Sequence, residues 1–172
     1  MPKIIDMKQY KDQIAKIPIF SYLAEKEFRK LLKSADLLAF EDGEKIIFQG
    51  ELSDYFFGIV KGKVDVSTRE KKKEVFIYSI GEGEIFGEAA IFMAEQRTAN
   101  VHSSGDSVVV RIHRKEIVSL IKYHPISANR FLILIIYSLL KKMRASTEEI
   151  AGSKTVYMDS KELHTRIRRF LK

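Results

Sequence analysis

Residues 86–99 decide the fold, and they read Phe86-Gly87-Glu88-Ala89-Ala90-Ile91-Phe92-Met93-Ala94-Glu95-Gln96-Arg97-Thr98-Ala99. An apolar strand ends here, Gly87 lets the backbone turn, and a short helix begins at the small residues Ala89 and Ala90. A helix start whose N–H groups are not covered by large side chains can bind an anion. Arg97 can add a planar charge for the same anion, and Glu88 can accept from a neighbouring hydroxyl. The alternative is a capped helical turn with a surface Glu–Arg pair. The order and spacing favour a ligand with one phosphate beside a ribose 2′-hydroxyl.

The chain around this stretch is rich in glycine and in short strand-forming runs. Eight of the nine glycines lie between positions 43 and 105, and the runs between them include alternating apolar and polar residues. Strands are predicted at residues 45–48, 55–60, 63–67, 75–80 and 107–112. Short strands at this spacing, separated by glycine turns, are typical of an antiparallel barrel or sandwich. We therefore expect a mainly β domain with helices at its flanks.

Helical periodicity flanks the predicted β domain on both sides. Short helices are predicted at residues 6–17, 27–32 and 116–121, and a long one at 126–150. The middle of the long helix is apolar on every face, and one β domain can cover only one side of it. We expect a homodimer through residues 126–150. The expected stripe between the two copies consists of Leu132, Ile135, Ile136 and Leu139.

The stretch at 86–99 resembles the phosphate-binding cassette of the cyclic nucleotide-binding domain family. Residues 38–51, 55–64 and 81–88 resemble the strands that lead to this cassette, and the resemblance extends from about Ile17 to Ile150. It implies an antiparallel jelly-roll, or double-stranded β-helix, with short N-terminal helices and a long C-terminal dimerisation helix. The implied segments are an N-terminal helical segment (1–35), a nucleotide-binding β-roll (36–124), a dimerisation and lid helix (125–150) and a basic tail helix (151–172).

The resemblance also implies roles for individual residues. In the family, the positions of Glu88 and Arg97 bind the ribose 2′-hydroxyl and the cyclic phosphate, and the N–H groups of Ala89 and Ala90 face the phosphate. A hydroxyl at the position of Thr98 bonds either the phosphate or the purine. The base therefore stays open between cyclic AMP and cyclic GMP. The implied ligand-binding set is Gly87, Glu88, Ala89, Ala90, Arg97, Thr98 and Ala99.

The long helix is implied to close over the base. Where the cyclic AMP receptor class offers hydroxyls to adenine, this chain has Lys142 and Met143, which is a departure from the family pattern. Lys142, Met143 or Arg144 would instead lie over the purine as a stacking or apolar lid. The alternative is that these residues form helix surface or the seam of the dimer.

These inferences predict a regulatory sensor that transmits nucleotide binding through its long helix and tail to an unknown effector. Residues 161–172 carry five basic residues against one acidic residue, and Leu163, Ile167 and Leu171 form an apolar face. The 22 residues after Ile150 are too few for a winged helix-turn-helix with its own core, so we expect no sequence-specific DNA binding by this chain. Two alternatives remain: the effector-domain fragment of a cyclic AMP receptor-type transcription regulator, and a dimerisation module with no nucleotide ligand.

Composition excludes several other classes. The chain has 172 residues, of which 45% are hydrophobic and 31% charged, which argues against disorder. Without cysteine it has no disulfide, thiolate metal site or cysteine nucleophile. The longest apolar run, residues 131–136, is far too short for a membrane span, and the first residues show no secretory signal, so we expect a cytoplasmic protein. The four histidines show no metal-ligand spacing and no hydrolytic motif is present, so we expect neither a bound metal nor an enzyme.

Overall fold

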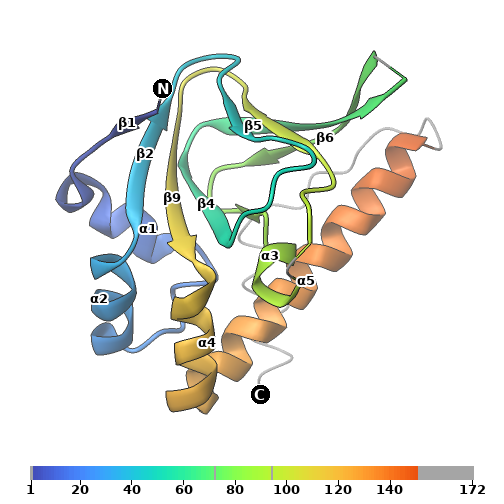
Figure 1. Ribbon diagram of the computed structural model, residues 1–172. Helices are drawn as coiled ribbons and strands as arrows, with labels where there is room; N and C mark the ends of the chain where they lie inside the picture. The colour runs from blue at the N-terminus through green and yellow to red at the C-terminus, as the bar shows by residue number, and fades with distance from the viewer. Residues whose placement is uncertain (1, 72, 94, 151–172) are drawn as a thin grey trace.

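Two antiparallel sheets form the centre of the molecule (Figure 1). The computed structural model describes residues 2–71, 73–93 and 95–150. The first sheet has the order β1-β2-β9-β4-β7, from Lys3–Ile4, Asp36–Phe40, Ser107–His113, Tyr55–Lys61 and Ile85–Phe86. The second has the order β3-β8-β5-β6, from Lys45–Ile47, Asn100–Ser103, Lys63–Glu70 and Lys73–Gly81. The predicted antiparallel β domain with flanking helices is thereby confirmed.

The central strands of the five-stranded sheet are buried on both faces, which explains their unbroken apolar runs. In β9, Val109 faces a core shared with the second sheet, while Val108 and Val110 face a core shared with the helices. In β4, Phe57 faces the core shared with the second sheet, and Phe56 faces the core shared with the helices. A strand covered on both sides has no polar face, so its sequence does not alternate. This sheet therefore joins the barrel interior to the helical layer.

The helices pack on the outer face of that sheet. They are a 3₁₀ turn η1 (Met7–Tyr10), α1 (Lys11–Lys16), α2 (Glu25–Lys33), α3 (Ala89–Phe92), α4 (Arg114–Tyr123) and α5 (Pro125–Ile150). All four predicted helical segments are present, although η1 replaces the first turn of the expected helix at 6–17. That helix ends at Lys16, before Pro18, because proline restricts the residue that precedes it. The strand end predicted at Phe86 is present as β7, whereas the short strands β1 and β8 were not predicted, since two to four residues carry too little periodicity.

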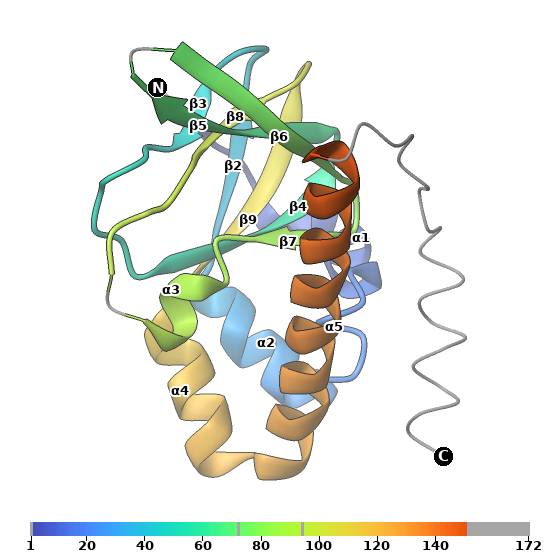
Figure 2. The same ribbon diagram turned by 90° about the vertical axis from the view of Figure 1, so that its right-hand side faces the viewer.

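The long helix α5 runs from α4 past β7 and β6 (Figure 2). Its inner side is buried at Ala128, Phe131, Leu134 and Ile135. The expected dimer stripe therefore needs correction, because Ile135 is wholly enclosed by its own domain. The exposed apolar stripe consists of Ile136, Leu139, Leu140 and Met143. The predicted tail helix at 151–172 lies outside the described residues.

Among the helices that the structure describes, none combines the length and apolar character required to cross a bilayer.

Candidate functional site

The cassette forms a tight strand–turn–helix. Strand β7 ends at Phe86, Gly87 takes a left-handed conformation with φ +70°, and α3 begins at Ala89. A side chain at Gly87 would place its Cβ 3.0 Å from Nη1 of Arg97, so only glycine combines this turn with this packing. The Ala90 N–H donates to the Gly87 carbonyl at 3.2 Å. In the described part of the chain the Ala89 N–H donates to no other group, so of the two predicted N–H groups this one is left for a ligand.

Arg97 is drawn inward against the cassette. Its Nη1 donates to the Gly87 carbonyl at 3.0 Å, and its Nη2 donates to the Ser53 hydroxyl at 3.1 Å and to the Tyr55 carbonyl. These partners come from the cassette, the loop before β4 and β4 itself. The guanidinium is thus fixed by two separate segments of the chain, residues 53–55 and the cassette.

The charge of Arg97 is only partly compensated. The residue is buried, and within the described ranges its guanidinium makes no ion pair with a carboxylate. Burial lowers the pKa of Arg97, and the carboxylates of Glu51, Glu88 and Asp54 act in the opposite direction. Nε is a buried nitrogen with no hydrogen-bond partner in the described structure. A buried donor without an acceptor is costly, so this group is suited to receive an anion.

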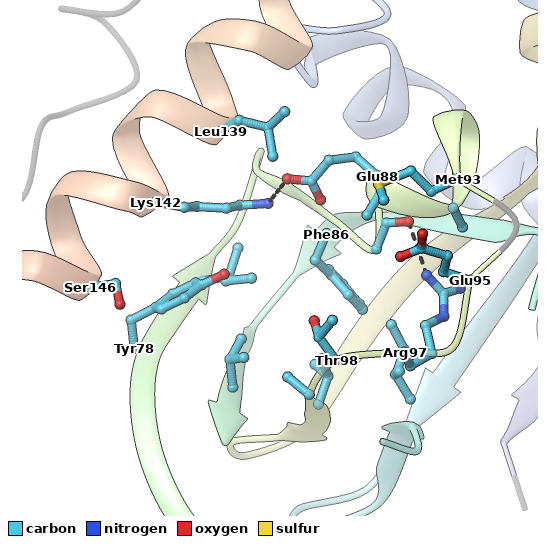
Figure 3. A pocket seen from close by; sticks show the side chains of 18 of the residues that line it. Tyr78, Phe86, Glu88, Met93, Glu95, Arg97, Thr98, Leu139, Lys142 and Ser146 are labelled. Atoms are coloured by element: carbon cyan, nitrogen blue, oxygen red, sulfur yellow. Dashed lines mark hydrogen bonds and ion pairs between the residues drawn. The ribbon is translucent and has the colours of Figure 1, made fainter. Parts of the chain in front are cut away.

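Glu88 is paired with the long helix. Lys142 Nζ lies 2.5 Å from Glu88 Oε1 and donates to the Ile85 carbonyl at 2.7 Å. Both side chains are nearly buried. Figure 3 shows Lys142 reaching from α5 to Glu88, while Arg97 approaches the cassette from the segment after α3. The two cations therefore reach the cassette from different elements.

A cavity of about 580 Å³ lies between the cassette, the second sheet and α5. This volume is in the range of small-molecule sites, about 300–1,000 Å³. All seven predicted ligand-binding residues line it, together with Lys142 and Met143 of the predicted lid. Arg144 does not line the cavity and is exposed. The structure thus brings together all the predicted ligand-binding and lid residues except Arg144.

Several lining residues were not predicted. Tyr78 on β6, Glu95 before Arg97, and Leu139 and Ser146 on α5 also line the cavity. Helical periodicity offered a signal for the last two, since positions 139, 142, 143 and 146 share one face. Burial, followed by the charges of Glu88 and Glu84, raises the pKa of Tyr78 well above 10, so its hydroxyl stays protonated. Tyr78 therefore offers a donor on the wall of the cavity.

The cavity combines an inward-facing cation, a carboxylate and apolar walls. Ile47, Val66, Ile80, Phe86 and Val101 provide apolar surface between the charged groups. Such a site can hold a small anion next to a hydroxyl and enclose a flat apolar group. Among the described residues, no group of three or more His, Asp and Glu side chains is arranged to hold a metal ion.

The chain is similar to several known proteins. The model of the family described as "cyclic nucleotide-binding domain" matches residues 37–124, just over half of the chain. The chain is also 36% identical over 100 residues to the Drosophila melanogaster "cGMP-dependent protein kinase, isozyme 2 forms cD5/T2". That match covers 57% of this chain and 11% of the kinase, so the chain spans about a tenth of this relative's length.

Solved structures share the fold. A cyclic nucleotide-binding domain from Methylobacillus flagellatus KT superposes with a TM-score of 0.74 at 20% identity, covering 92% of each chain. The regulatory domain of Toxoplasma gondii PKA, crystallised with cAMP, gives 0.64 at 23% identity over 76% of this chain and 49% of that one. Thermus thermophilus catabolite activator protein gives 0.61 at 25% identity over 78% and 62%.

Proposed function

Since the chain belongs to the cyclic nucleotide-binding domain family, we propose that the cavity beside α5 binds one cyclic mononucleotide and that binding repositions α5. The chain then acts as a regulatory module and not as an enzyme. The cyclic phosphate lies on Arg97 and the Ala89 N–H, the ribose on Glu88, and the purine toward α5. We propose residues 36–124 as the binding unit and 125–150 as the responding helix.

The observation that carries this proposal is the unsatisfied side of Arg97. Three of its N–H groups donate to the protein, which leaves the Nε–H and the second N–H of Nη1. A cyclic phosphate carries one negative charge and several acceptor oxygens, so it supplies both the missing acceptor and the missing counter-charge. The ribose hydroxyl beside the phosphate of such a ligand needs an acceptor, and the Glu88 carboxylate supplies one.

The identity of the purine depends on the end of the cavity toward α5. Tyr78 and Ser146 offer hydroxyls there, and Leu139 and Met143 offer apolar contact. Hydroxyls can donate or accept, so they suit the edges of both adenine and guanine. We propose cyclic AMP as the preferred ligand, with cyclic GMP as the competitor that the titration must include.

Calorimetric titration of the full chain with cyclic AMP, cyclic GMP, 5′-AMP and inorganic phosphate tests the proposal. We expect a cyclic nucleotide to bind at least about tenfold more tightly than 5′-AMP or phosphate, a difference of about 1.4 kcal/mol. A preference for cyclic GMP of more than about tenfold would overturn the choice of base alone. Binding of phosphate without any cyclic nucleotide would overturn the proposal and favour a dimerisation module whose cassette holds another anion.

We further propose that two copies pair through the exposed stripe on α5, Ile136, Leu139, Leu140 and Met143. Four neighbouring apolar side chains on one helix face form a surface that a monomer would leave in water. Ile136→Lys combined with Leu140→Lys should turn a dimer into a monomer in light scattering at micromolar concentration. Val118→Lys, at an exposed apolar position on α4, is the matched control and should leave the mass unchanged. A monomeric wild type would contradict dimerisation.

We propose that α5 and the residues after it contact an effector. The alternative is that the chain is a fragment of a DNA-binding transcription regulator, and gel-shift assays with DNA distinguish these two possibilities. We expect no sequence-selective DNA binding at physiological salt, with or without nucleotide, because basic residues alone give only salt-sensitive, non-specific affinity. A sequence-selective shift under these conditions would favour the regulator.

A further inference from the structure

The ion pair between Lys142 and Glu88 lies within the proposed nucleotide site. Fifty-four residues separate the two in sequence, and their side chains are only 14% and 5% exposed. Removing two charges from water is costly, so a buried pair contributes little to stability relative to apolar packing. The adjacent pair, Lys141 with Glu84, leaves about a third of each side chain exposed. Of these two neighbouring pairs, the one that lines the cavity carries the higher desolvation cost.

Lys142 occupies only one oxygen of Glu88. Its Nζ contacts Oε1, and no described residue donates to Oε2. Oε2 is not among the buried atoms that lack a partner, so it is accessible, and Glu88 lines the cavity. In Figure 3 the second oxygen of this carboxylate points away from Lys142. A carboxylate can accept several hydrogen bonds, so Oε2 can take a ligand hydroxyl while Oε1 stays with Lys142.

Lys142 also removes an electrostatic conflict. A buried carboxylate without a partner is costly and would turn toward another cation of the site. Arg97 is such a cation, and the Glu88 charge already acts on it. An unpaired Glu88 would thus oppose an anionic ligand and compete with it for Arg97. Lys142 pairs with the carboxylate and holds it toward α5, on the side of the cavity away from Arg97 (Figure 3).

We infer that Lys142 is a positioning residue of the nucleotide site, which holds Glu88 by Oε1 so that Oε2 accepts the ribose 2′-hydroxyl. The inference rests on the proposed function. It makes α5 part of the ribose site, because the helix is attached to the carboxylate that the sugar contacts. A ligand that moves the Glu88 carboxylate then also moves Lys142, which lies one helical turn from both Leu139 and Ser146 on α5.

A pair of ligands that differ only in the 2′-hydroxyl tests this role. The full-length chain and its Lys142→Met variant are titrated calorimetrically with the preferred cyclic nucleotide and with its 2′-deoxy analogue. Methionine keeps the length and helix propensity of lysine and removes the charge. The variant should bind the ribonucleotide about tenfold more weakly, the effect of one charge-assisted hydrogen bond, and the 2′-deoxy analogue nearly as the wild type does. The preference for ribose should therefore disappear.

Three controls separate positioning from general damage. Lys141→Met removes the neighbouring ion pair and should change neither affinity by more than about threefold, as expected of a partly exposed pair. Lys142→Arg should restore the ribose preference, because a guanidinium can also hold Oε1. Glu88→Gln should lose the preference, and adding Lys142→Met to it should cause no further loss, since the two residues act as one unit. Thermal melting of each variant confirms folding.

The outcomes are distinct. Tighter ribonucleotide binding by Lys142→Met would show that Lys142 competes with the sugar, which overturns the inference. An equal loss for both ligands would place the effect on the phosphate or on folding, and would overturn it as well. A wild type that binds nucleotide without ribose preference contradicts this inference and leaves the proposed function intact. A wild type that binds no cyclic nucleotide contradicts both.

Discussion

The two ends of the cavity are built by different means. At the cassette end, Arg97 is fixed by hydrogen bonds to Gly87, Ser53 and Tyr55, of which two accept through backbone carbonyls. At the α5 end, the helix lies across the cavity with Lys141 and Lys142 paired to Glu84 and Glu88. Backbone acceptors inside a barrel cannot move without breaking strands. The partly exposed pair of Lys141 with Glu84 can exchange partners at small cost, whereas the buried pair of Lys142 with Glu88 ties α5 to a side chain that lines the cavity.

From this difference we expect the cassette end to set affinity and the α5 end to respond to the ligand. A rigid, preorganised cation binds an anion without paying for its own ordering. A helix tied to the cavity by side chains can shift when a ligand contacts one of those side chains and favours another position, which is what a population shift requires. The comparison therefore predicts that substitutions at the cassette end change affinity most, while those toward α5 have smaller effects that depend on the ligand.

The largest effect is expected at Arg97. Arg97→Ala removes the cation at the phosphate position of our proposal and should weaken binding by about 1.5–3 kcal/mol, or about 10- to 150-fold. Arg97→Lys retains the charge, and its nucleotide affinity should lie between those of the wild type and Arg97→Ala, because the point charge of an ammonium cannot replace the planar guanidinium. Calorimetry gives the affinities. Equal binding of cyclic AMP by wild type and Arg97→Ala would contradict our expectation that the cassette end sets affinity.

Gly87→Ala tests whether the rigidity of the cassette end matters. Its φ of +70° would strain any other residue, and its Cβ would meet Arg97 Nη1 at 3.0 Å. Gly43→Ala is the matched control, with φ +74° and no atom within 4 Å of the added Cβ. Both variants should lose about 1–2 kcal/mol of unfolding free energy in denaturant titrations, the cost of a left-handed alanine.

Only Gly87→Ala should also lose nucleotide affinity, by about tenfold, because it displaces the guanidinium as well as straining the turn. Affinity losses of the same size in both glycine variants would mean that backbone strain alone affects the site. In that case, the fixed position of Arg97 would not be what sets affinity.

The same two ends differ in how far the sequence predicts them. The cassette is contiguous, so the order of Gly87, Glu88 and Arg97 predicts the strand end, the turn and the short helix, and the family resemblance implies seven of the residues that line the cavity. Its hydrogen bonds were not predictable, because Ser53 and Tyr55 are brought to Arg97 by long-range pairing, through the bridge of Leu52 with Gln96 and the pairing of β4 with β7. Local spacing thus determined which residues form this end, and tertiary packing determined how they are held.

The α5 end depends on how the helix is rotated against the barrel. Periodicity alone placed Ile135 in an intersubunit stripe, whereas the structure buries it within its own domain. An apolar helix has no polar face to mark its orientation, so the sequence could not distinguish inner from outer positions. The pairing of Lys142 with Glu88 across 54 residues has no local signal. Once α5 is placed, the helical repeat accounts for Leu139 and Ser146 beside Lys142.

A smaller effect, dependent on the base, is expected at Ser146. Ser146→Ala removes one hydroxyl from the α5 side of the cavity. It should weaken the preferred cyclic nucleotide by about fivefold, the value of a single neutral hydrogen bond of about 1 kcal/mol. The other purine should be affected less, so the ratio of the cyclic AMP and cyclic GMP affinities should change. If Ser146→Ala weakens both equally, α5 contacts the ligand without distinguishing the base.

The smallest effect is expected at Thr98, which lines the cavity beside Arg97 but belongs to neither fixed network. In the described structure its hydroxyl makes no hydrogen bond, so it is not needed to hold the cassette together. Thr98→Val keeps the shape and removes the hydroxyl, and calorimetry should show a loss of about threefold, within the range for one neutral hydrogen bond. If the hydroxyl supports the phosphate, cyclic AMP and cyclic GMP weaken alike, and Thr98 belongs with the affinity end. If cyclic GMP weakens more, the hydroxyl contacts guanine, and base discrimination begins at the cassette. That second result would contradict the division of affinity and response between the two ends of the cavity.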